Sequence, residues 1–203
     1  MTMDLVVLVG GAILLVNGRT FQVLIAYVVL AVMAGALGAT AAFASPATFV
    51  LFAVATLLKV VLAPLGIVLF VRANPAAADL RPSMPLPGRL LLVIAFALLA
   101  KMVARLPAVA PVPMADLVAF VVLCGVGMLI VHRNLVAHMV GLLVLGIGIG
   151  FAGSMLAPGL PEPIELGTAF DALIATVIGL AIVRAIVVHD PLLDVESLRR
   201  LRG

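Results

Sequence analysis

The chain has 203 residues, of which 66% are hydrophobic and only 10% are charged. This balance lies far from the composition of soluble domains and indicates an integral membrane protein. The formal net charge of +3 comes without a basic run, so the sequence gives no indication of nucleic-acid binding. The single cysteine, Cys124, excludes a disulfide within the chain. Its apolar surroundings favour a packing role over a reactive thiol.

The apolar stretches are predicted to cross the bilayer as α-helices. They lack the alternation of barrel strands and approach the about 20 residues that a helix needs to span the hydrocarbon core. In chain order the expected spans are 3–17, 21–43, 47–71, 89–107, 114–131, 135–157 and 166–188. The proline-rich segment 72–88 is the one substantial loop expected between them. We therefore expect a single all-α transmembrane domain over 1–203, a bundle of about seven helices.

The distribution of charged residues predicts how these helices are oriented. Seven spans place the two termini on opposite sides of the membrane. One side receives Arg19, Arg72, Arg81, Arg89, Arg133, Arg199, Arg200 and Arg202. The other receives Asp4, Asp116, Glu162 and Glu165, with Arg105 as the exception. Because basic loops remain in the cytoplasm, we expect the N-terminus outside and the C-terminus inside.

Lys59 lies near the middle of the third span, within the stretch LLKVVLAPL of residues 57–65. A charge at that depth costs roughly 2.5–3.5 kcal/mol on insertion scales unless it meets a partner or water. Two interpretations remain open. Lys59 is either an exchangeable lysine of a proton path or a structural cation bonded to backbone carbonyls. Pro64 supports the second, because it frees the carbonyl of residue 60 from its helical donor.

Other ionisable side chains lie within the later spans. Lys101 stands in the outer half of span four, and Asp171 lies at a similar depth in span seven. The two can pair if their helices touch; alternatively, Lys101 extends to the outer interface. His138, one turn inside span six, is either a hydrogen-bonded interfacial residue or a proton relay. The candidates for the outer face or for ion pairs there are Arg105, Glu162 and Glu165.

No motif for catalysis, metal binding or cofactor binding is recognised. The three histidines and one cysteine form no close ligand set in the sequence. Phosphate loops, dinucleotide fingerprints and nucleophile elbows are missing as well. We expect no catalytic, cofactor-binding or metal-ligating residue in this chain. Gly146, Gly150 and Ser154 form a ridge of small residues that predicts a closely packed helix face.

The segment VHRNLVAHMVGLLVLGIGIGFAG, residues 131–153, resembles the K subunit of bacterial respiratory complex I and the C subunit of Mrp-type antiporters. The similarity is carried by the turn Arg133-Asn134-Leu135 and the pair Gly141-Leu142, and with the ending DVESLRRLRG it covers 113–203. The full chain is similar to the hydrogenase-4 component E family, whose motifs match LLKVVLAPL and LPEPIELGTAFDALIA, residues 160–175. Residues 1–112 then form additional N-terminal helices.

This resemblance implies a non-catalytic small subunit in the membrane arm of a complex I-like, ion-translocating oxidoreductase. The location implied is the cell (inner) membrane of a bacterium or archaeon. Antiporter-like membrane subunits and the lipid bilayer would be its partners. A nickel–iron centre or iron–sulfur clusters would belong to those partner subunits. The proton or ion path through this chain would draw on Lys59, Lys101, His138 and Asp171.

The chain departs from its relatives where they carry glutamates. Leu143 follows the Gly-Leu pair directly, Gly146 stands one turn later, and Ala175 marks the second glutamate position in the last span. Asp171, one turn before Ala175, is the carboxylate that remains nearby. A purely structural assembly subunit and a free-standing small transporter are therefore the alternative functions.

Overall fold

The computed structural model describes residues 2–42, 46–80, 82–112, 114–156 and 161–187. In these ranges the chain forms α1 (Thr2–Val16), α2 (Thr20–Ala42), α3 (Pro46–Leu57), α4 (Ala63–Ala73), α5 (Leu86–Ala104), α6 (Ala115–Val131), α7 (Leu135–Leu156) and α8 (Pro161–Val187). A π-helical turn, Leu58–Leu62, joins α3 to α4, and a 3-10 turn, Pro75–Ala78, follows α4. The described residues contain no strand, so the fold is all-α.

The predicted helices are confirmed as helices, but some ends lie elsewhere. α8 begins at Pro161 rather than at residue 166, and α5 covers Leu86–Ala104 rather than 89–107. Prolines explain both early starts. Proline is tolerated in the first turn of a helix, where its missing N–H has no helical partner to lose, and Pro161 and Pro87 occupy such positions.

Several of these helices are suited to a bilayer. Within the described residues, four stretches are long and apolar enough to cross a membrane: Ala53–Ala73, Leu86–Ala104, Leu135–Gly153 and Leu166–Ile186. Shorter apolar stretches occupy Leu5–Val16, Thr20–Ala36 and Ala115–Val131. Large apolar side chains are also exposed on the outer surface, for example Leu91 and Val177, each 67% exposed. Soluble monomers rarely expose apolar surface so extensively, so this chain is a membrane protein.

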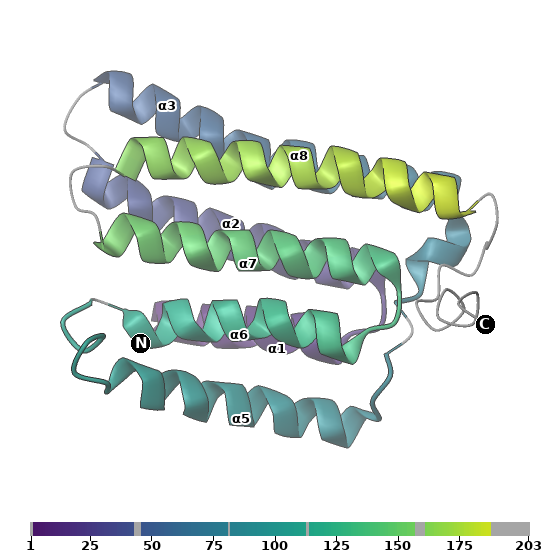
Figure 1. Ribbon diagram of the computed structural model, residues 1–203, viewed down its shortest axis with the longest axis horizontal. Coiled ribbons are helices and arrows are strands. Elements are labelled where there is room, and N and C mark those ends of the chain that lie inside the picture. Colours follow the sequence, from purple (N-terminus) through teal and green to yellow (C-terminus); the bar gives the residue numbers. More distant parts are fainter. Residues whose placement is uncertain (1, 43–45, 81, 113, 157–160, 188–203) are drawn as a thin grey trace.

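The helices lie side by side in two layers (Figure 1). The front layer contains α5, α6, α7 and α8 in chain order. In the rear layer, α1 packs against α5 and α6, α2 packs against α7, and α3 and α4 pack against α8. As a result α5 and α8 occupy opposite edges of the bundle.

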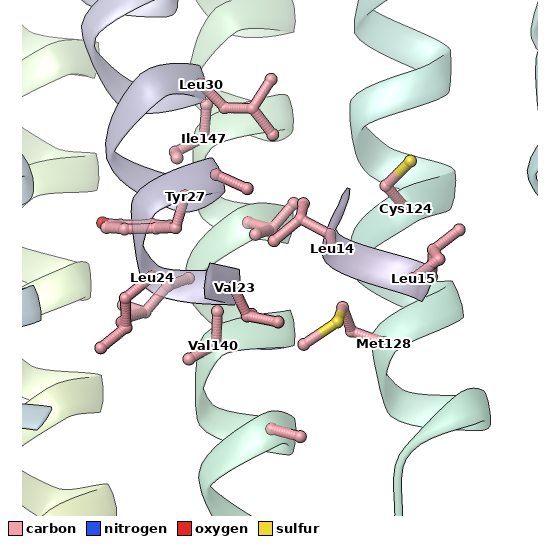
Figure 2. Packing of buried hydrophobic residues seen from close by; sticks show 14 of the residues in the cluster. Leu14, Leu15, Val23, Leu24, Tyr27, Leu30, Cys124, Met128, Val140 and Ile147 are labelled. Atoms are coloured by element: carbon pink, nitrogen blue, oxygen red, sulfur yellow. The ribbon is translucent and has the colours of Figure 1, made fainter. Parts of the chain in front are cut away.

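The core between the layers is apolar and well filled. Figure 2 shows Leu14 of α1 and Tyr27 of α2 among side chains of α6 and α7. Cys124 and Met128 of α6 are fully buried in the same cluster. The burial of Cys124 agrees with the packing role expected from the sequence.

Glycines bring α6 and α7 into very close contact. A Cβ atom added to Gly125 of α6 would lie 2.8 Å from the backbone nitrogen of Leu145 and 3.0 Å from the backbone oxygen of Gly141. Real Cβ atoms do not approach backbone so closely, so this helix spacing requires glycine at position 125.

The predicted ridge of small residues on α7 is only partly a packing face. A Cβ atom on Gly150 would lie 2.9 Å from a methyl group of Thr168 on α8, so this glycine does allow a close approach. A Cβ atom on Gly146 would meet nothing within 4 Å, so the prediction is wrong there. The side chain of Ser154 lies outside the described ones.

At one end of the bundle the loops are joined by hydrogen bonds. The buried Asn134 accepts the N–H of Val136 through its Oδ1 at 2.8 Å, which caps α7, and its Nδ2 donates to the carbonyl of Asp79 at 2.8 Å. His132 is buried, and its Nε2 lies 3.0 Å from the carbonyl oxygen of Asn17. Burial lowers the pKa of His132, which favours the neutral ring. Because a carbonyl oxygen only accepts hydrogen bonds, Nε2 carries the hydrogen and donates it to Asn17. The asparagine of the Arg-Asn-Leu turn thus has a structural role.

Candidate functional site

Lys59 lies in the π-helical turn, at the point where the chain changes its hydrogen-bond register. The N–H of Ala63 donates to the carbonyl of Leu58, five residues back. In the same register, residue 64 would donate to the carbonyl of Lys59, but Pro64 has no N–H. Pro64 therefore withholds a helical donor from Lys59, not from residue 60 as predicted, because the π turn shifts the register by one residue.

Tyr27 supplies a donor in place of the one that Pro64 lacks. Its hydroxyl donates to the carbonyl oxygen of Lys59 at 3.2 Å, from α2 across to the π turn. Tyr27 is fully buried, and a buried tyrosine hydroxyl normally finds a hydrogen-bond acceptor. Tyr27 was not among the residues predicted from the sequence. The available signal was that Tyr27 is the one tyrosine of the chain and lies inside an apolar span.

A cavity of about 150 Å³ adjoins Lys59, and we call it the Lys59 cavity. Tyr27 of α2 and Asp171 of α8 line it together with Lys59, which is itself only 6% exposed. Thr168 of α8 also contributes to its wall. A single water needs about 10–15 Å³, so the cavity has room for several. The structure thus brings two of the predicted site residues, Lys59 and Asp171, to one cavity that is otherwise lined mainly by apolar side chains.

The three positions at which the resemblance noted in the sequence leads one to expect glutamate meet at the same cavity. Leu143 and Gly146 of α7 and Ala175 of α8 all line it. Gly146 has open space where a side chain would begin. Asp171 and Ala175 are exposed, so the cavity reaches the outer surface of the bundle along α8. The site therefore has a buried ammonium inside and a carboxylate at its outer edge.

Lys101 belongs to a different part of the molecule. Its Nζ lies 3.7 Å from the Oδ2 of Asp116, with 66% and 39% of the two side chains exposed. The alternative in which Lys101 pairs with Asp171 does not apply, because α5 and α8 lie at opposite edges of the bundle. Arg105 is exposed at the C-terminal end of α5, one helical turn after Lys101.

The remaining predicted residues do not line the Lys59 cavity. His138 is half-buried, and its Nδ1 lies 3.0 Å from the carbonyl oxygen of Asn134 one turn earlier. This matches the hydrogen-bonded alternative given for it. Glu162 and Glu165 fall within α8, but their side chains lie outside the described ones. In the described part of the chain, no three His, Cys, Asp or Glu side chains are grouped as a metal site would require.

No protein-family model, curated protein or solved structure matches this chain. The geometry of the Lys59 cavity is therefore the basis for a function of this chain.

Replacing Tyr27 by phenylalanine is expected to lower the free energy of unfolding by about 1–3 kcal/mol, the usual cost of leaving a buried acceptor without its donor. Thermal unfolding of the purified protein in detergent measures this. The control is the same substitution combined with Pro64→Ala, which provides residue 64 with an N–H. We expect the Tyr27→Phe effect to shrink in that background. An equal effect in both backgrounds would contradict the role assigned to the Tyr27 hydroxyl.

Proposed function

We propose that the chain is a non-catalytic small subunit in the membrane arm of a complex I-like, ion-translocating oxidoreductase. In this proposal the Lys59 cavity is part of the proton or ion path. The observation that carries it is the convergence of Lys59, Asp171 and the three expected glutamate positions on one cavity. Ionisable residues inside a membrane protein mark ion pathways or functional sites, and π turns are frequent at such sites.

The surface position of Asp171 supports the presence of a partner subunit. This carboxylate is exposed on α8, within the apolar stretch Leu166–Ile186. A charge that faces lipid costs about 2.5–3.5 kcal/mol at mid-membrane depth, and the cost is smaller but still unfavourable in the outer half of the span, where Asp171 lies. A neighbouring subunit with polar groups removes that cost. We propose that an antiporter-like subunit covers this face, and that any nickel–iron or iron–sulfur centre resides in other subunits of the assembly.

The cavity suggests how a proton would cross this chain. Lys59 offers an ammonium as the inner proton donor, and Asp171 offers a carboxylate as the outer acceptor. Water in the cavity would join the two groups. The path then continues through the partner subunit, since Leu143, Gly146 and Ala175 provide no further titratable group.

We also propose that all seven apolar helical stretches cross the cell membrane of a bacterium or archaeon, with the N-terminus outside. The concentration of arginines in the loops after α1, α4 and α6 supports this orientation. Cysteines introduced at single positions in 72–88 are expected to react with a membrane-impermeant maleimide in inside-out vesicles. Reaction in intact cells instead would reverse the orientation.

Purification in mild detergent followed by mass spectrometry tests the proposed assembly. We expect the chain to copurify in fixed stoichiometry with larger antiporter-like membrane subunits and with an oxidoreductase. If the chain purifies alone and transports ions in liposomes, it is a free-standing transporter. If the complex forms and pumps normally after both Lys59 and Asp171 are neutralised, the subunit is purely structural. The purely structural role is the second candidate function. It is favoured by the residues without a titratable group, Leu143, Gly146 and Ala175, at the three positions where glutamate was expected.

A further inference from the structure

A second cavity lies at the end of the bundle where α1 turns into α2 and α5 begins. Its volume is about 870 Å³, and it shares no lining residue with the Lys59 cavity. Arg19 of the α1–α2 turn and Arg89 of α5 both line it, so we call it the arginine cavity. Neither arginine has a role in the proposed ion path.

The guanidinium of Arg89 is held between the end of α1 and the cavity. Its Nη1 donates to the carbonyl of Val16 at the end of α1. Its Nε is buried and has no hydrogen-bond partner among the described residues. A guanidinium carries five N–H donors and no acceptor, and a buried donor left unsatisfied is destabilising. Arg89 also lines the cavity, where N–H groups of its guanidinium can donate to an anionic oxygen.

Arg19 adds a second guanidinium from another element. It is exposed, and its backbone pairs with that of Asp79 in an antiparallel bridge. Gln22 provides a neutral amide on the same lining. Asp79 contributes one carboxylate, so the two arginines leave the described lining with a positive charge. Paired guanidinium groups suit phosphate, whose oxygens accept two parallel N–H bonds from each fork.

The position of the cavity along the helices indicates where such an anion would come from. The apolar stretch Leu5–Val16 ends at the cavity and Thr20–Ala36 begins there, while Arg89 lies in the first turn of Leu86–Ala104. The arginine cavity thus lies between the ends of apolar helices, at the level expected for lipid headgroups. Basic pockets at that level bind anionic lipids. Phe21, 48% exposed, supplies an apolar wall beside the arginines.

We propose that the arginine cavity binds a phosphate-bearing anion, with Arg19 and Arg89 as its ligands. Its location favours the headgroup of an anionic phospholipid, and free phosphate is the other source of the same chemistry. The bound phosphate accepts N–H groups of Arg19 and Arg89 and bridges the α1–α2 turn to α5.

Native mass spectrometry of the full-length protein tests this, using detergent micelles doped with phosphatidylglycerol or phosphatidylcholine. A parallel calorimetric titration uses inorganic phosphate. We expect retention of phosphatidylglycerol over phosphatidylcholine, and binding about tenfold weaker or more in Arg19→Gln, because a charge-assisted contact to phosphate is lost. Arg133→Gln is the matched control. Arg133 is exposed at the same end of the bundle but does not line the cavity, so its variant should bind as the wild type does.

Arg89→Gln is expected to weaken binding further. If that variant does not fold, as judged by circular dichroism, Arg19→Gln alone decides the outcome. If Arg19→Gln loses phosphatidylglycerol binding, the site exists and its ligand is a lipid headgroup. If Arg19→Gln loses binding of inorganic phosphate, the site exists and its ligand is a soluble phosphate. Binding of both ligands that is equal in wild type and Arg19→Gln would overturn the proposal.

Discussion

Replacing Lys59 by methionine is expected to reduce ion translocation by the assembled complex about tenfold or more while the complex still forms. Methionine keeps the length and flexibility of the side chain but removes its charge. Methionine cannot carry the proton that Lys59 donates in the proposed path, so the barrier to proton transfer rises, and each 1.4 kcal/mol of barrier slows the rate about tenfold. Proton uptake into proteoliposomes that contain the purified assembly measures this rate.

Lys101→Met is the matched control for this experiment. It removes the same charge from an exposed lysine at the other edge of the bundle, where the residue pairs with Asp116. Exposed ion pairs contribute little, so transport and assembly should both stay near wild type. Weakened assembly together with normal pumping in Lys59→Met would assign Lys59 a structural role instead.

Replacing Gly125 by alanine is expected to destabilise the bundle by about 2 kcal/mol or more, near the upper part of the range for overpacked cores. The added Cβ would lie 2.8 Å from a backbone nitrogen of α7, and no side-chain rotation can relieve a contact with backbone. The two helices must therefore separate. Thermal unfolding in detergent measures the loss, and expression in the membrane should fall with it.

Gly146→Ala provides the control on the facing helix. The new methyl group would meet nothing within 4 Å, and alanine favours helix over glycine by about 1 kcal/mol. The variant should thus be as stable as the wild type or slightly more stable. Equal destabilisation by the two substitutions would contradict the described packing of α6 against α7.

The helices could be predicted from the sequence because hydropathy is a local property, and the depth of Lys59 followed from its place in its span. The π turn could not be predicted, since the donor that compensates for Pro64 comes from Tyr27, 32 residues earlier and on another helix. The carboxylate that pairs with Lys101 could not be predicted for a related reason. Depth in the membrane gives no information about which helices are neighbours, and Asp116 proved to be the nearer carboxylate.

Two members of the candidate site were predictable, but Tyr27 and the arrangement of the site were not. Lys59 and Asp171 were named from their polarity at depth, but the sequence did not place them on one cavity. Gly146 shows the limit most clearly. As a small residue on α7 it predicted helix packing, and the structure leaves open space beside it. Whether a glycine allows a close contact or borders a cavity depends on the opposite helix, which spacing along one helix does not reveal.

Photo-cross-linking from position 175 tests the central claim, that the Lys59 cavity opens toward a neighbouring subunit. Ala175 is exposed and lines the cavity, so a photoreactive side chain there leaves Lys59 and Asp171 in place. Irradiation of native membranes is expected to join the chain to a larger membrane subunit, identified by mass spectrometry of the adduct. Adducts with phospholipid alone would show that this face of α8 meets lipid and would contradict the proposed function of the cavity.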